Sequence, residues 1–122
     1  MYTKRAERFN FSRGDWEPAG ELSQIRIGAV ATNHNDSIFV IGGSKSNSAE
    51  RYDVGMNNWV LIELSLPTMV RNSALISHPS GGYLIVGGTI ASGLHVDIDN
   101  KSVTEVEYRT EFSFAGNSVV NF

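Results

Sequence analysis

The sequence predicts an all-β fold in which four-stranded antiparallel sheets repeat along the chain. Apolar residues come in short runs rich in Val, Ile, Leu and aromatic side chains, and each run is bounded by Gly, Asn, Asp, Ser or Pro. No window carries the sustained apolar stripe of an amphipathic helix. The same runs return after about 43 to 45 residues, a period typical of repeat architectures.

An aromatic cassette shows this period most clearly. Residues 6–10, Ala-Glu-Arg-Phe-Asn, precede Trp16, and residues 49–53, Ala-Glu-Arg-Tyr-Asp, precede Trp59. The apolar run that ends in Gly42-Gly43 likewise returns as a run that ends in Gly87-Gly88. A third cassette is eroded, because Val96 and Val103 stand where the Tyr and the Trp would be. The chain therefore holds two whole units and parts of a third.

Each whole unit divides into four strands, which we name A to D. Clusters of Asn, Asp, Gly, Ser and Pro mark the turns between them, since these residues tolerate tight and left-handed conformations. The predicted strands lie near residues 26–32, 37–42, 49–53 and 58–63 in one unit, and near 71–77, 83–87, 93–98 and 102–107 in the next. Four antiparallel strands per repeat form the blade of a β-propeller.

We expect a single partial propeller over residues 1–122. Its segments are strands C and D of a partial blade (1–20), a full blade (21–65), a full but divergent blade (66–110) and strand A of a following blade (111–122). Propellers close with about four to eight blades, so we expect an incomplete ring. The chain is then a segment of a longer protein, or one of two copies that close a six-bladed ring, or an open propeller covered by another partner.

The combined motif resembles the kelch repeat. An apolar run ending in Gly-Gly, then Tyr52, then Trp59 matches that family fully, whereas the unit after Gly87-Gly88 lacks both aromatic residues. The resemblance implies that the aromatic residues fill the space between blades and that the glycines allow close backbone approach. The predicted structural signature is Phe9, Trp16, Gly42, Gly43, Tyr52, Trp59, Gly87 and Gly88.

Strand alternation places the B-to-C and D-to-A loops on one face of the blades. In proteins that this chain resembles, that face binds peptide segments of partner proteins, so we expect a non-catalytic protein-interaction module. The candidate partner-binding residues are Arg26, Ser44, Lys45, Asn47, Arg71 and Asn72. For Arg26 and Arg71 a scaffold role is the alternative, since both recur at the repeat period.

No residue stands out as catalytic. Phosphate-loop, nucleophile-elbow and zinc-protease motifs are absent from the sequence, and we expect neither a cofactor nor a metal site, although His34 and His78 recur one period apart. Two other classes of function remain as alternatives. One is part of a sugar-acting enzyme on kelch blades, of the mutarotase or epimerase type, and the other is a structural segment of a large assembly.

The amino-acid composition argues against two classes of partner, nucleic acid and membrane. The formal net charge is −3 with both signs interspersed, which argues against nucleic acid. The sequence has no cysteine and no apolar stretch of membrane-spanning length, so disulfides, thiolate metal sites and a membrane partner are not expected. A cytoplasmic location is the default expectation.

Overall fold

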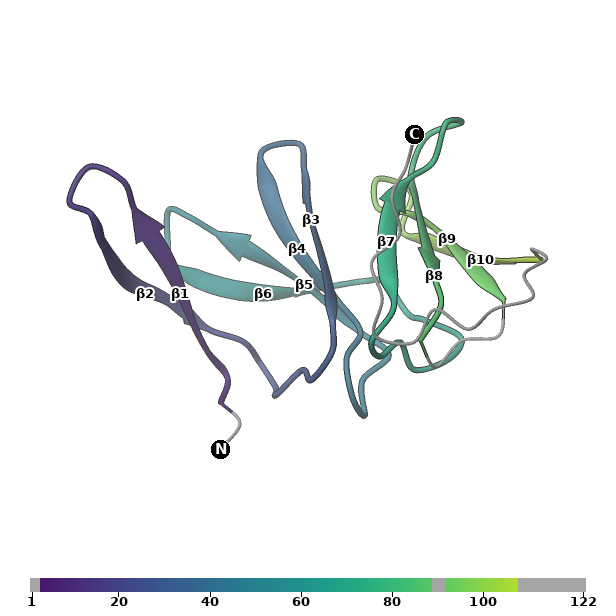
Figure 1. Ribbon diagram of the computed structural model, residues 1–122, viewed down its shortest axis with the longest axis horizontal. Coiled ribbons are helices and arrows are strands. Elements are labelled where there is room, and N and C mark those ends of the chain that lie inside the picture. Colours follow the sequence, from purple (N-terminus) through teal and green to yellow (C-terminus); the bar gives the residue numbers. More distant parts are fainter. Residues whose placement is uncertain (1–2, 89–91, 108–122) are drawn as a thin grey trace.

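The computed structural model describes residues 3–88 and 92–107, and all of their regular structure is β-strand. Figure 1 shows three sheets following one another along the chain, from the N-terminal hairpin to the C-terminal sheet. None of the described residues forms a helix that is long and apolar enough to cross a membrane. The expected strand at 111–122 lies outside the described residues.

The first sheet is a two-stranded hairpin. It pairs β1 (Arg5–Asn10) with β2 (Asp15–Glu21), and the pairing places Phe9 opposite Trp16. Because Phe9 and Trp16 are directly opposite each other, their rings meet edge to face at 5.4 Å between centroids.

The second and third sheets each have four antiparallel strands in chain order. The second contains β3 (Val30–His34), β4 (Ser37–Ile41), β5 (Ala49–Asp53) and β6 (Asn58–Ile62). The third contains β7 (Ala74–Ser77), β8 (Tyr83–Val86), β9 (Gly93–Asp97) and β10 (Ser102–Val106). These sheets have the strand number and order of propeller blades, and the described residues do not close a ring.

Strand A begins later than the sequence predicts in both sheets. The predicted starts are residues 26 and 71, whereas the strands begin at Val30 and Ala74. The residues between are held by loop contacts instead, because Ser44 N–H donates to Ile27 O at 2.8 Å and Asn72 N–H donates to Gly28 O at 3.0 Å. The residues just before strand A therefore hydrogen-bond to neighbouring loops, and pairing with strand B begins only after them.

The apolar core lies between the two larger sheets and is continuous across them. Ile41, Ala49 and Val30 come from the second sheet, while Ile85 and Val96 come from the third. Leucines of the β6–β7 connection complete it, and the fully excluded side chains include Ile41, Ile85, Leu94, Val70 and Val96. Burial of this shared face fixes the two sheets against each other.

The two diglycines occupy backbone conformations that suit glycine. Gly42 and Gly43 have φ of 75° and 102°, and Gly87 and Gly88 have φ of 79° and 64°. A Cβ on Gly43 would lie 2.9 Å from Arg26 Cβ and 3.0 Å from Arg26 Cα. The strand end at Gly42-Gly43 thus makes room for the chain segment that leads into β3.

Candidate functional site

The loops that the sequence assigns to partner binding lie at the lower end of the sheets in Figure 1. The β4–β5 loop runs over residues 42–48 and the β6–β7 connection over residues 63–73. Gly43 N–H donates to Val70 O, and Leu66 N–H donates to Asn47 O, each at 2.8 Å. Backbone hydrogen bonds therefore join the two loops into one surface, which we call the loop face.

A pocket of about 330 Å³ opens on the loop face. It is lined by Ser44, Lys45, Thr68, Met69 and Arg71. Lys45 and Arg71 are exposed, and Met69 exposes 53% of its surface. Three of the six candidate residues, Ser44, Lys45 and Arg71, thus meet around one concavity.

Two further candidates, Asn47 and Asn72, belong to the same loops and are exposed, but they do not line the pocket. Asn72 takes a φ of 57°, and its backbone N–H donates to Gly28 O. Asn47 uses its backbone carbonyl to hold Leu66 N–H. Both residues therefore help to shape the loops while their side chains remain on the surface.

Arg26 lies inside the scaffold beneath this face. Its side chain is 0% exposed, and Nε donates to Glu50 Oε2 at 2.9 Å. Nη1 reaches Gly42 O at 2.9 Å, Ser46 Oγ at 3.0 Å and Ser48 O at 2.8 Å, and Nη2 donates to Ser48 Oγ at 2.8 Å. The guanidinium is therefore saturated by the protein's own acceptors.

Glu50 is the partner that the sequence reasoning did not assign to Arg26. Its side chain is 0% exposed, and its other oxygen accepts a hydrogen bond of 2.8 Å from Ser23 N–H. The sequence did contain a sign of this ion pair. Glu50 stands in a predicted strand between residues of the buried cassette, and a buried carboxylate needs a cation beside it. The geometry of Arg26 matches the scaffold alternative and places the loop face above a fixed ion pair.

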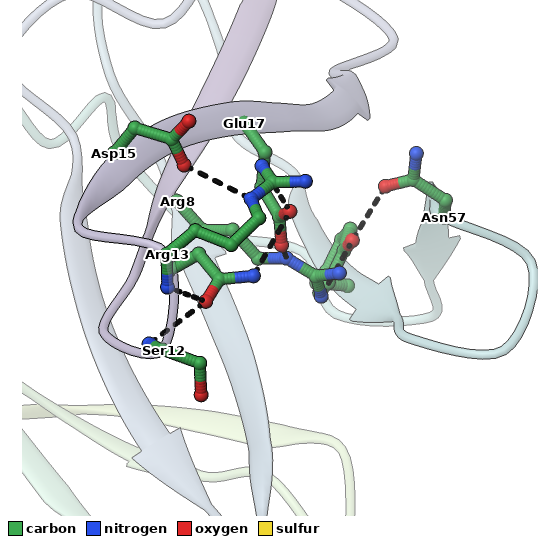
Figure 2. A network of polar contacts seen from close by, with 8 residues as sticks. Arg8, Ser12, Arg13, Asp15, Glu17 and Asn57 are labelled. Carbon is green, nitrogen blue, oxygen red and sulfur yellow. Dashed lines mark hydrogen bonds and ion pairs between the residues drawn. The ribbon is translucent and has the colours of Figure 1, made fainter.

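The hairpin carries a second network of charges, on its exposed surface. Figure 2 shows Arg8 and Arg13 reaching toward Glu17, with N···O distances of 2.6 and 3.0 Å. The hydrogen bond from Arg8, and after it the one from Asn10, lower the pKa of Glu17 below its ordinary range. The same contact with Glu17 raises the pKa of Arg8. This network joins the two strands of the hairpin and continues from Arg8 through the Tyr52 hydroxyl to Asn57 of the second sheet.

The aromatic signature residues divide into a covered pair and an exposed pair. Tyr52 is 4% exposed and packs on Trp59, with 5.1 Å between ring centroids. Trp59 Nε1–H donates to Ala19 O of β2 at 2.8 Å, so this pair fills the space between the hairpin and the second sheet. Phe9 and Trp16 hold the same register positions in the hairpin, yet Trp16 is 63% exposed.

The structure does not bring the two recurrent histidines together. His34 contacts Tyr83 Oη and Asp99 Oδ1, each at 2.9 Å, whereas the His78 ring packs edge to face on His95 at 5.0 Å. Within residues 3–88 and 92–107, no group of three or more His, Cys, Asp or Glu side chains has the arrangement of a metal site. Both histidines make contacts that connect strands or turns.

Comparison with protein families gives one match. Residues 25–63 match the family model of the kelch motif, a stretch that covers β3 to β6 and includes both Arg26 and Glu50. No significant match was found among curated proteins. The matched stretch is the unit in which the sequence pattern, the four-stranded sheet and the buried ion pair coincide.

Proposed function

We propose that this chain, whose residues 25–63 match the family model of the kelch motif, is a non-catalytic interaction module whose loop face binds a partner protein. The pocket lined by Ser44, Lys45 and Arg71 carries the proposal, because it gathers polar groups from two separate loops around one concavity. The saturated Arg26–Glu50 pair supports those loops from beneath, so the surface is preorganised.

The charges on the pocket favour an acidic partner segment. Lys45 and Arg71 both line it, and among the residues that the structure describes no Asp or Glu lines it. The exposed Lys45 ammonium suits carboxylates, Arg71 adds positive charge beside it, and the exposed Met69 offers an adaptable apolar contact. The class of ligand that fits is therefore an extended peptide with Asp or Glu beside an apolar residue.

We expect acidic peptides to bind the chain and a charge-reversed loop face to lose them. The measurement is fluorescence anisotropy with two labelled peptide pools, one of Asp/Glu and Leu and one of Lys/Arg and Leu. Lys45→Glu combined with Arg71→Glu should weaken acidic-peptide binding by at least about tenfold, since it replaces attraction by repulsion. Higher salt should weaken binding to the parent chain as well.

Lys4→Glu is the matched control, because Lys4 is an exposed cation just before β1 and lies outside the loop face. It should leave acidic-peptide binding unchanged. Equal binding by the doubly reversed variant, or a preference of the parent chain for the basic pool, would contradict the proposal.

The hairpin supports a second proposal, about assembly. Tyr52 and Trp59 cover the sheet that precedes them, and Phe9 and Trp16 present the same register positions one period earlier. Phe11 is 90% exposed beside them, with its ring 5.1 Å from that of Phe9. Such an aromatic face is suited to burial, and we propose that a second copy covers it with its last blade.

We expect the purified chain to have the mass of a dimer by light scattering at several concentrations. Trp16→Lys should shift it toward the monomer, because a charge would replace a ring at the centre of the contact. Met56→Lys is the control, since Met56 is a similarly exposed apolar residue of the β5–β6 turn. A folded monomer at all concentrations would instead direct the search to blades on another chain.

A further inference from the structure

The two inter-sheet spaces are built from equivalent positions but are filled differently. Between the hairpin and the second sheet, Arg8 donates to Glu17 across β1 and β2, and its Nη1 lies 3.4 Å from Tyr52 Oη. The Tyr52 hydroxyl in turn donates to Asn57 Oδ1. Trp59 Nε1–H donates to Ala19 O, so two aromatic rings fill this space and the arginine in it has hydrogen-bond partners.

Strand register identifies the equivalent positions in the next space. Tyr52 opposes Trp59, and Val96 opposes Val103, so two valines replace the two aromatic residues. The β5–β6 and β9–β10 turns have the same length and a positive φ at the same place, which is 49° at Asn57 and 55° at Lys101. The third unit thus retains the backbone of the blade while losing two rings.

Arg51 is the counterpart of Arg8, but it has neither an opposing carboxylate nor a tyrosine hydroxyl from the following sheet. Arg8 opposes Glu17, whereas Arg51 opposes Val60 in β6. The tyrosine that meets Arg8 from the following sheet is replaced by Val96. Arg51 is half-buried, and none of the described residues forms a hydrogen bond or an ion pair with its guanidinium.

A pocket of about 590 Å³ opens beside Arg51, at the opposite end of the sheets from the loop face. Its apolar walls are Phe39, Leu61, Ile62 and Ile98. The other lining groups that can carry charge are paired with one another, since Asp99 Oδ1 lies 2.9 Å from His34 Nε2 and Glu63 Oε2 lies 3.7 Å from Lys101 Nζ. Arg51 is the cation in this lining that lacks a described carboxylate partner.

We propose that this pocket binds a small aromatic carboxylate. Its lining comes from the second sheet and from the β9–β10 turn of the third, and its volume lies in the usual range for small-molecule sites, about 300–1,000 Å³. The ring would pack on the walls around Phe39 and Ile62, and the carboxylate would accept the forked N–H groups of Arg51. The site is independent of the loop face, so it stands or falls separately from peptide binding.

Calorimetry with indole-3-acetate, and with indole-3-acetamide as its neutral counterpart, tests the site on the whole chain. We expect the acid to bind with a dissociation constant below about 1 mM and the amide to bind at least about tenfold more weakly. Arg51→Met keeps the apolar stem and removes the charge, so it should remove the preference for the acid. Arg13→Met is the matched control, since Arg13 is an exposed arginine of the hairpin turn, and it should leave both affinities unchanged.

A second variant tests the volume rather than the charge. Leu61→Trp places a large ring at an exposed lining position and should weaken binding of the acid. Because overpacking can prevent folding, NMR shifts of the parent chain give an independent reading, in which His34 should respond to the acid and His78 should not. No binding up to about 1 mM, or equal affinity for the acid in Arg51→Met, would overturn the proposal.

Discussion

Replacing Arg26 by Met will lower the free energy of unfolding by about 3–5 kcal/mol, which is the usual effect of removing one partner from a buried ion pair. Glu50 would remain as a fully buried carboxylate with only Ser23 N–H to stabilise it. The carbonyls of Gly42 and Ser48 would also lose a donor. Urea unfolding followed by circular dichroism, with the m-value checked for constancy, measures this change.

The partner substitution separates the ion pair from the rest of the network. Glu50→Gln leaves the buried guanidinium without a counter-charge, but it should cost less than Arg26→Met, because the amide oxygen and the acceptors of Gly42, Ser46 and Ser48 still hold the guanidinium. Arg13→Met is the exposed control, since the Arg13 side chain is 55% exposed where it pairs with Asp15 and Glu17, and it should change the free energy of unfolding by at most about 1 kcal/mol. If Arg26→Met unfolds at the parent midpoint, the guanidinium faces solvent and becomes a candidate for partner binding again.

This prediction bears on function as well as on stability. Arg26 holds the carbonyls of Gly42 and Ser48 at both ends of the loop that carries Lys45. A variant that remains folded but releases this loop should bind acidic peptides more weakly, with no change of charge on the surface. The proposed function therefore depends on a residue that the partner never touches.

Much of the fold could be read from the sequence because its signals are local. Strands C and D of the second sheet, Ala49–Asp53 and Asn58–Ile62, fall where apolar alternation and turn residues predict them. The start of strand A was predicted too early, because the backbone of residues 26–29 is held by neighbouring loops. Local pattern does not reveal which partner a backbone N–H finds.

The site was less accessible to sequence reasoning for a similar reason. Periodicity marks Arg26 and Arg71 as equivalent, yet the structure buries the side chain of Arg26 and leaves Arg71 exposed at a pocket. The space beside Arg51 was not predicted either, although the missing Tyr and Trp of the third unit were visible. Recognising that space requires the strand register, which pairs Arg51 with Val60 and Val96 with Val103.

Substitution of Tyr52 should also cause a large loss of stability, because its ring joins the hairpin to the second sheet. Its side chain is almost fully buried, packs on Trp59 and receives the Arg8 guanidinium at its hydroxyl. Tyr52→Ala should lower the free energy of unfolding by about 3–5 kcal/mol, as large-to-small changes at buried aromatic residues do. The same urea experiment measures this loss.

Tyr52→Phe isolates the hydroxyl from the ring. It removes the hydrogen bonds to Asn57 and Arg8 but keeps the packing, so it should cost only about 0.5–1.5 kcal/mol. In Tyr52→Ala, the amide protons of β1 and β2 should exchange faster, because the Tyr52 ring helps to hold the hairpin against β6. If the alanine and phenylalanine variants were equally stable, ring volume would contribute nothing between these sheets.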